Sequence, residues 1–372
     1  MFKIFRLQIH LFLNVIAIIL FSVTTISIVH AAPTFGNQSS NLSVDWDFDF
    51  VETFDGLQDW VRTEGSIGNT EDVSKMPKLL NGSDSAWGYY SMWGDDRTPP
   101  DNWIGAHDYE NNLVWRGTKS AAIDIGESAY GPSRFGLHMG EGYDEFYLFF
   151  MVNIPKNEFP TSCITAEGAP SSCQASATGV YTPNEPYAWF SSWKFTTFNM
   201  DCPSAMCPDR NTYSDYWAIL SHIKQYNYGN APGLTLQASP RGFNNSENEW
   251  ASDGDMRLDP YLGDWFGLEY HVSRRDGITY WDIWFYDKEG NATKVMDDQP
   301  LATLEASQGR RWNQIFFGGN NSETYSWGET MKSAYYLDDV IVDDKRIGPK
   351  YFSVIGTNGS TQPRSPTQVT VE

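Results

Sequence analysis

Apolar and polar residues alternate in short runs through most of the chain. In residues 133–139, the hydrophobic Phe135, Leu137 and Met139 alternate with Arg134, Gly136 and His138. Side chains of a strand alternate between two faces, so such runs predict half-buried strands. Gly, Asn, Asp and Pro separate the runs, and no long stretch has a helical period. We therefore expect strands at residues 45–54, 113–125, 132–140, 145–154, 187–198, 215–227, 233–239, 265–274, 279–287, 311–318 and 334–343.

This succession of strands predicts an all-β protein, an antiparallel β-sandwich that spans residues 45–352. Residues 155–186 and 199–214 interrupt the pattern and are rich in Pro, Ser and Asn, as is typical of long loops with a functional role. These two insertions contain the four cysteines of the chain. A zinc site is one interpretation of the cysteines. Their spacing favours two disulfides that tie the loops, Cys163–Cys173 and Cys202–Cys207.

Residues 1–31 have the pattern of a secretory signal peptide. Lys3 and Arg6 precede an apolar run that ends near Val29, and small residues then precede Ala32, where we expect cleavage. An uncleaved membrane anchor is the alternative. Cleavage would make the protein secreted, periplasmic or attached to the cell surface, with no membrane insertion afterwards. We expect a linker at residues 32–44 and a disordered tail at residues 353–372.

The chain of 372 residues carries a formal net charge of -21. This acidity argues against a nucleic-acid partner, because binding phosphates requires a basic face. It is suited to keeping an exported protein soluble, and we expect a monomer. Aromatic residues make up 15% of the chain. They can fill a sandwich core or stack on sugar rings, so an extracellular polysaccharide is a candidate partner.

Three expected strands combine an apolar face with a polar face that carries cations and bases. If these strands are neighbours in a curved sheet, their polar faces line one groove. A register slip of one residue would reverse each face. We expect His107 and His271 to be structural or to lie at the rim. The candidate groove residues are Arg134, His138, Lys194, His222, Lys224, Tyr226 and Tyr228, and Ser192 and Thr196 are expected on the same face as Lys194.

Such a groove suits an acidic polysaccharide. Arg134 can pair with a uronate carboxylate and so acidify the neighbouring C–H group. His138 or His222 would then act as the base and Tyr226 as the acid that protonates the leaving oxygen. Lys194, Lys224 and Tyr228 would bind neighbouring sugars. Together these roles describe β-elimination, the reaction of a polysaccharide lyase.

Two further sets of carboxylates are candidates for other roles. A glycoside hydrolase needs a pair of them, and the compact Glu-x-Asp-x-x-Glu pattern of sandwich-type glucanases is absent, which leaves Asp282 and Asp338 as weak candidates. Glu52 and Asp339 lie on the first and last expected strands, which often meet in a jelly roll. We expect them to hold a structural calcium ion, with plain edge-strand charge as the alternative.

Several segments resemble the concanavalin A-like lectin and glucanase jelly-roll family, and in particular its polysaccharide lyases. They are "FYLFFMVNIPKNEF", "DWFGLEYHVSRRDGITYWDIWFYDKEG", "NQIFFGGNN" and "SAYYLDDVIVDDKRIGP", within residues 46–350. The resemblance implies an exported jelly roll that acts on or binds glycans. Alginate lyases of that fold have an Arg-rich strand, a Gln-x-His strand and a Tyr-x-Lys strand. Here "SRFGLHM" and "SHIKQY" match that pattern loosely, and Gln-x-His is absent.

The sequence thus favours a secreted lyase that cleaves a uronate-containing glycan. A non-catalytic lectin-like module of the same fold is the alternative, and a hydrolase comes third. Convergence of the groove residues would favour the lyase, whereas scattered or outward-facing residues would favour binding.

Overall fold

The computed structural model describes the central part of the chain. The described residues are 47–58, 68–69, 78–83, 85, 87–92, 104–107, 113–124, 133–154, 175–176, 179–180, 187–200, 218–228, 231–241, 257–276, 278–301, 311–318 and 334–357. The expected signal peptide, the linker, residues 358–372 of the tail and all four cysteines lie outside this set, so the disulfides stay a prediction. Within it, no helix has the length and apolar character needed to cross a membrane.

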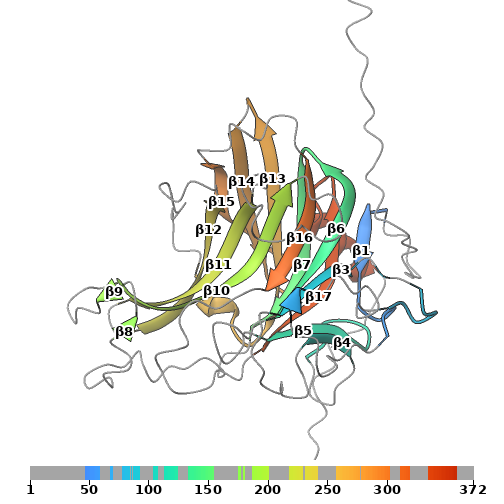
Figure 1. Cartoon of the computed structure of the whole chain (residues 1–372), viewed down its shortest axis with the longest axis horizontal. Coiled ribbons are helices and arrows are strands. Elements are labelled where there is room, and N and C mark those ends of the chain that lie inside the picture. The colour runs from blue at the N-terminus through green and yellow to red at the C-terminus, as the bar shows by residue number, and fades with distance from the viewer. Residues whose placement is uncertain are drawn as a thin grey trace, which may run out of the picture. The chain divides into compact units, whose positions relative to one another are not determined.

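The described strands form two large antiparallel sheets, as the alternating pattern predicted (Figure 1). The eight-stranded sheet has the order β15-β14-β13-β7-β17-β5-β4, with β1 paired to β17. Its strands are β1 (Phe50–Glu52), β4 (Ile104–His107), β5 (Ser120–Asp124), β7 (Phe146–Asn153), β13 (Trp265–Arg275), β14 (Ile278–Tyr286), β15 (Ala292–Leu301) and β17 (Ala334–Asp343).

The seven-stranded sheet has the order β12-β11-β10-β16-β6-β3-β2. Its strands are β2 (Gly68–Asn69), β3 (Trp87–Met92), β6 (Ser133–Tyr143), β10 (Tyr187–Met200), β11 (Ala218–Tyr228), β12 (Ala231–Arg241) and β16 (Trp312–Gly318). A separate pair, β8 (Ala175–Ser176) and β9 (Gly179–Val180), lies within the first expected insertion.

The main hydrophobic core lies between the two sheets. The ring of Phe150 on β7 packs against Phe195 on β10 and Phe317 on β16, with ring centroids 5.8 and 5.3 Å apart. Tyr270 on β13 contacts Phe198 on β10 in the same way, at 5.4 Å. Burial of these large rings removes much apolar surface from water, and this drives the two sheets together.

A second hydrophobic cluster covers the other face of the eight-stranded sheet. Helix α2 (Gly348–Thr357) packs there, and the ring of Tyr351 lies 4.6 Å from that of Phe149 on β7. This helix was not expected from the sequence, because "GPKYFSVIGT" is short and follows a strand-rich region. The expected domain boundary at residue 352 falls inside it.

Some strand predictions differ from the structure, and β2, β3, β4, β8 and β9 fall at residues where no strand was expected. Residues 113–119 form bends, and only β5 remains of the strand expected at 113–125. Strand β15 was not expected, because its sequence "ATKVMDDQPL" is largely polar. As the edge strand it leaves most of its side chains exposed, so its sequence carries little hydrophobic alternation.

Candidate functional site

The seven-stranded sheet has one face on the core and one face turned away from it, which we call the outer face. Leu137, Ile315 and Phe198 pair across β6, β16 and β10 and are buried in the core. The residues next to these three, His138, Gln314 and Asn199, also pair with one another and therefore lie on the outer face. The face expected for His138 from the sequence is thus confirmed.

Strand β11 places its candidate residues on the same outer face. Ile223 pairs with the buried Leu236, and the Ser221 hydroxyl contacts the core Tyr270 hydroxyl at 3.1 Å. His222 and Lys224 alternate with these two residues, so they occupy the opposite face. The structure describes the backbone, not the side chains, of Arg134, Lys194, His222, Lys224, Tyr226 and Tyr228.

Strand β10 needs a bulge to present Lys194 on this face. Lys194 pairs with His222, whereas Thr196 pairs with Ser221, so Phe195 is an extra residue on β10. A bulge of this kind resets the alternation of a strand. Phe195 and Thr196 are both buried, and Thr196 donates its amide N–H to the Ser221 hydroxyl. The expected position of Thr196 beside Lys194 is therefore wrong, because the bulge turns Thr196 into the core.

Strand β6 carries the other two candidates at different ends of the outer face. Arg134 pairs with Gly318, and His138 pairs with Gln314. Gly136 lies between them, opposite Phe316. A Cβ atom on Gly136 would lie 2.5 Å from the Phe316 ring, so this ring fills the space that the glycine leaves. Phe316 thus separates the Arg134 end of the face from the His138 end.

The register brings Arg134, Lys194 and His222 to one end of the outer face. Lys194 and His222 are directly opposite each other. Gly318, the partner of Arg134, follows Phe317, which pairs with Thr196 next to the bulge. Arg134 and Lys194 therefore lie two strand spacings apart, roughly 10 Å, with a glycine between them.

The remaining candidates lie further away. Tyr226 pairs with Trp189, four residues along β11 from His222, which is roughly 13 Å of strand. Lys224 pairs with Ser192 and Tyr228 with Tyr187, so the polar set continues along β11. His138 is separated from His222 by three strand spacings, roughly 14 Å, in addition to its offset along the strands.

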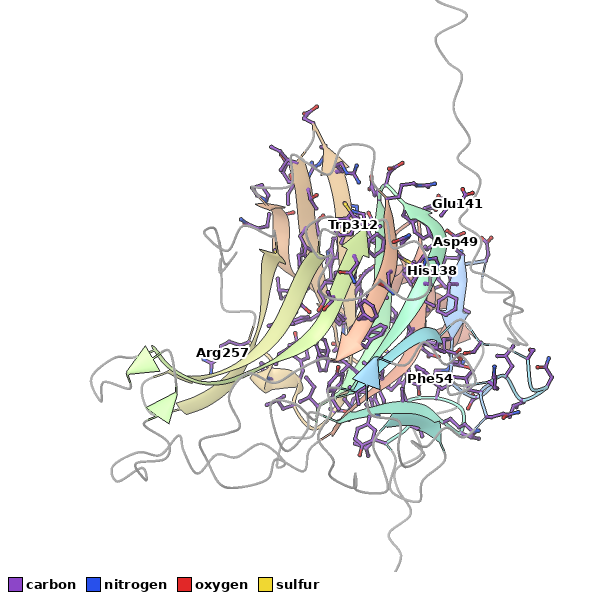
Figure 2. All side chains as sticks on the ribbon, in the orientation of Figure 1. Asp49, Phe54, His138, Glu141, Arg257 and Trp312 are labelled. Atoms are coloured by element: carbon purple, nitrogen blue, oxygen red, sulfur yellow. The ribbon has the colours of Figure 1, made fainter. Side chains whose placement is uncertain are left out.

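His138 has a defined hydrogen-bond role. Its Nδ1 accepts a hydrogen bond from the Gly140 amide at 3.2 Å. A neutral imidazole that accepts at Nδ1 carries its proton on Nε2, so this ring presents a donor on its other side. In this tautomer Nδ1 already accepts the Gly140 amide, so it is poorly placed to remove a proton as well. Figure 2 shows His138 beside the upper part of β6.

Sequence reasoning missed the amides beside His138. Asn199 donates its side-chain N–H to Gln314 Oε1 at 3.3 Å, and Gln314 pairs with His138. Both amides are buried although they face away from the core, as are Thr197 and Phe316. The fragment "NQIFFGG" gave no signal, because Gln314 meets a histidine only through strand pairing and not through a Gln-x-His sequence.

The carboxylates expected to hold calcium have separate partners. Strands β1 and β17 do pair, with Glu52 opposite Val340. Glu52 accepts hydrogen bonds from the Trp87 indole and the Phe54 amide, and burial raises its pKa to about 7. Asp339 accepts a hydrogen bond from Tyr351 on the other face of the sheet. Calcium held by both residues stays a prediction that this geometry does not favour.

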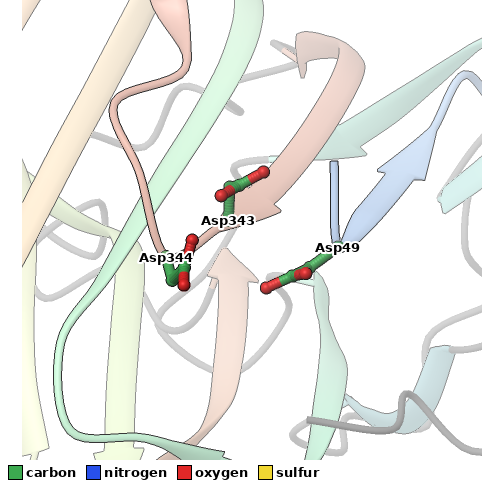
Figure 3. Close-up of side chains that lie close together, drawn as sticks. All are labelled: Asp49, Asp343 and Asp344. Carbon is green, nitrogen blue, oxygen red and sulfur yellow. The ribbon is translucent and has the colours of Figure 1, made fainter. Parts of the chain in front are cut away.

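A different carboxylate trio forms where these two strands meet. Oxygen atoms of Asp49, Asp343 and Asp344 lie within 4.8 Å of one another (Figure 3). The Tyr143 hydroxyl also donates to Asp49 at 2.9 Å. Carboxylate oxygens are the ligands that calcium prefers, so the trio fits such an ion better than Glu52 and Asp339 do.

No family model matches this sequence, and no curated protein does either. Solved structures that resemble the chain include a mutant of the alginate lyase Aly36B in complex with alginate trisaccharide, at 12% identity and a TM-score of 0.44, covering 80% of this chain and 98% of that one. Another is Rv0315, described as an immunostimulatory antigen and pseudo β-1,3-glucanase of Mycobacterium tuberculosis, at 11% identity and a TM-score of 0.33, covering 80% and 98%. At TM-scores this low, the likenesses carry no argument about activity.

Proposed function

We propose that this protein is exported and acts on an acidic extracellular polysaccharide, as a lyase that cleaves a uronate-containing glycan by β-elimination. The observation that supports this most is the strand register, which gathers Arg134, Lys194 and His222 at one end of the outer face. The backbones of these two cationic residues and the histidine lie within roughly 10–15 Å of one another. Arg and Lys side chains are long, so the three residues can contact one uronate and its neighbour.

The register suggests a role for each residue. Arg134 neutralises the uronate carboxylate through a bidentate pair. His222 removes the proton from the carbon beside the carboxyl group, a double bond forms to the next carbon, and the bond from that carbon to the leaving oxygen breaks. An acid then protonates the leaving oxygen.

The register favours a different acid from Tyr226, the acid expected from the sequence. Tyr226 lies roughly 13 Å along β11 from His222, so the two do not reach the same bond easily. Lys194 is directly opposite His222 and is the better-placed acid. Tyr226, Lys224 and Tyr228 then bind sugars further along the same strand.

A carbohydrate-binding module without catalysis is the second candidate. Its support is the other end of the outer face, where the partly buried His138 pairs with Gln314 and Gln314 pairs with Asn199; both amides are buried, so His138 is the group that a sugar would reach. Neutral groups of this kind hydrogen-bond sugar hydroxyls without proton transfer. A lectin would need this end of the face and could dispense with the pair Lys194 and His222.

The test is an incubation of the mature protein with alginate, glucuronan, ulvan, pectate and glycosaminoglycans, followed by ultraviolet absorbance of the unsaturated product. We expect a rise with one substrate and a fall in rate of about 100-fold or more in His222→Ala and in Arg134→Ala. Lys288→Ala is the control, because Lys288 is exposed and pairs with Asp264 far from these residues in the sequence.

Each other outcome has a clear meaning. Binding of a polysaccharide without any absorbance rise would replace the lyase with the lectin-like module. Full activity in both variants would show that the reaction centre lies elsewhere. Neither binding nor cleavage of any acidic glycan would contradict both candidates.

A further inference from the structure

His271 lies between two carboxylates on the eight-stranded sheet, apart from the candidate site. Its Nδ1 is 2.7 Å from Asp282 Oδ2 on β14, and its Nε2 is 2.7 Å from Glu145 Oε1. The ring stacks on Tyr147 of β7, with centroids 4.1 Å apart and planes 5° apart. Each nitrogen of this imidazole therefore faces a carboxylate at full hydrogen-bond contact.

Only a protonated imidazole can donate to both carboxylates. A neutral histidine carries one N–H and leaves its other nitrogen lone pair facing a carboxylate oxygen. The pKa of His271 is raised because the hydrogen bonds to Asp282 and Glu145 outweigh the opposing effect of burial. The pKa values of Glu145 and Asp282 are correspondingly lowered by the bond to His271.

The two carboxylates are held to different extents. Asp282 also pairs with Lys294 on β15 at 2.8 Å, and its Oδ1 accepts the Asp298 amide at 2.7 Å. Glu145 has a half-exposed side chain, and within the described part of the chain only His271 hydrogen-bonds to it. Loss of the histidine proton would therefore free Glu145 and leave Asp282 in place.

Glu145 occupies a particular place in the topology. It lies in the turn between β6 and β7, which belong to different sheets, so this turn carries the chain from one layer to the other (Figure 1). Strand β13, which carries His271, pairs with β7 beside this turn, and His271 pairs with Tyr147. The bond between His271 and Glu145 thus ties the crossover to the eight-stranded sheet.

We propose that His271 is a proton-operated latch, which holds the β6–β7 turn against the eight-stranded sheet when protonated and releases it when neutral. Four other charged residues line the same pocket as His271, Glu145 and Asp282, namely Arg275, Lys294, Asp297 and Asp298, and Arg346 lies over the neighbouring Trp284. A pocket of about 420 Å³ opens beside the ring, so protons can exchange with solvent.

The direction of the pH effect follows from the difference between the pKa of His271 in the folded and in the unfolded chain. A histidine whose pKa is raised by folding contributes stability that is present below its unfolded value, 6.5, and that is lost as pH rises through the folded value. Glu145 and Asp282, with lowered pKa values, contribute stability that is lost only in acid. The latch is therefore closed below pH 6.5 and opens as the pH rises through the raised folded pKa of His271.

Hydrogen exchange of the whole mature protein, followed by mass spectrometry, tests the latch. The rates at pH 6 and pH 9 are corrected for the intrinsic pH dependence of exchange. We expect protection of peptides that cover residues 141–147 to fall about tenfold or more at the higher pH, the effect of losing one charged hydrogen bond. Peptides from residues 265–270 should change less.

Two variants make the test decisive. Glu145→Gln changes a half-exposed residue and should fold normally. Its amide can donate to a neutral imidazole, so the fall in protection between pH 6 and pH 9, here called the step, should vanish. Lys288→Gln removes an exposed ion pair elsewhere and should keep the step. An unchanged step in Glu145→Gln, or no step in the natural protein, would overturn the latch. The proposal does not depend on the proposed lyase activity.

Discussion

At the scale of single residues, Gly136 shows how one missing side chain shapes the outer face. Gly136 has no side chain to place between Arg134 and His138 on this face of β6. In the structure the Phe316 ring fills that space from the neighbouring strand. The glycine therefore serves packing, and it sets the distance between the two ends of the candidate site.

A side chain at this position should disturb both stability and the site. We expect Gly136→Ala to push the Phe316 ring away and to lower the free energy of unfolding by about 1–3 kcal/mol, the usual cost of overpacking. Chemical denaturation measures this change. Gly356→Ala is the matched control, because a Cβ atom there meets no other atom within 4 Å and the residue lies in a helix. Equal stability of the two variants would show that Phe316 has room to move.

At the scale of elements, Glu269 joins helix α2 to the eight-stranded sheet. This buried carboxylate on β13 accepts hydrogen bonds from the Ile347 and Gly348 amides, at 2.6 and 3.3 Å, where the helix begins, and from the Tyr286 hydroxyl. A carboxylate at a helix N-terminus satisfies amides that have no partner inside the helix. Burial raises the pKa of Glu269, and these donors act in the opposite direction.

Removal of this carboxylate should loosen the helix. We expect Glu269→Ala to lower the free energy of unfolding by about 3 kcal/mol, because buried donors lose their acceptor. Glu269→Gln should cost less, since its amide oxygen can still accept. Denaturation curves give both values, and Glu289→Ala on an exposed turn serves as the control. Similar losses in Gln and Ala variants would mean that the charge itself, rather than the acceptor, holds the helix.

At the scale of the whole molecule, acidity and buried carboxylates act together on stability. The net charge of -21 creates self-repulsion at neutral pH. Burial raises the pKa of Asp343 to about 7 and that of Asp339 to about 6. A carboxylate whose folded pKa is raised is protonated more readily in the folded state, so its contribution to stability falls as the pH rises from the unfolded value, 3.8, to the folded value.

The protein should therefore lose stability between about pH 4 and pH 7, by on the order of 2 kcal/mol, and change little through these groups at higher pH. Thermal unfolding as a function of pH measures this loss. Asp343→Asn should flatten the curve, because an amide has no proton to lose. High salt should weaken the contribution of surface repulsion and leave that of the buried carboxylate nearly unchanged. A curve for Asp343→Asn that parallels the natural protein would assign the loss to net charge alone.

Much of the fold was available from the sequence because alternation is a local property. The chain's own pattern predicted an all-β sandwich, and it gave the outer face for His138 and for His222, because the register shift on β6 comes after His138 and the extra residue beside His222 lies on β10. Polar β15 and short α2 escaped detection, because their stability comes from packing on neighbours and their sequences carry little periodic signal.

Tertiary structure decided what depends on partners far along the chain. The bulge at Phe195 sends Thr196 into the core, and it arises from pairing with β11. The meeting of Gln314 with His138, the ring of Phe316 over Gly136 and the separation of Tyr226 from His222 all follow from strand order and register. A strand's own residues fix which side chains share a face, but only long-range pairing fixes which strands lie beside it.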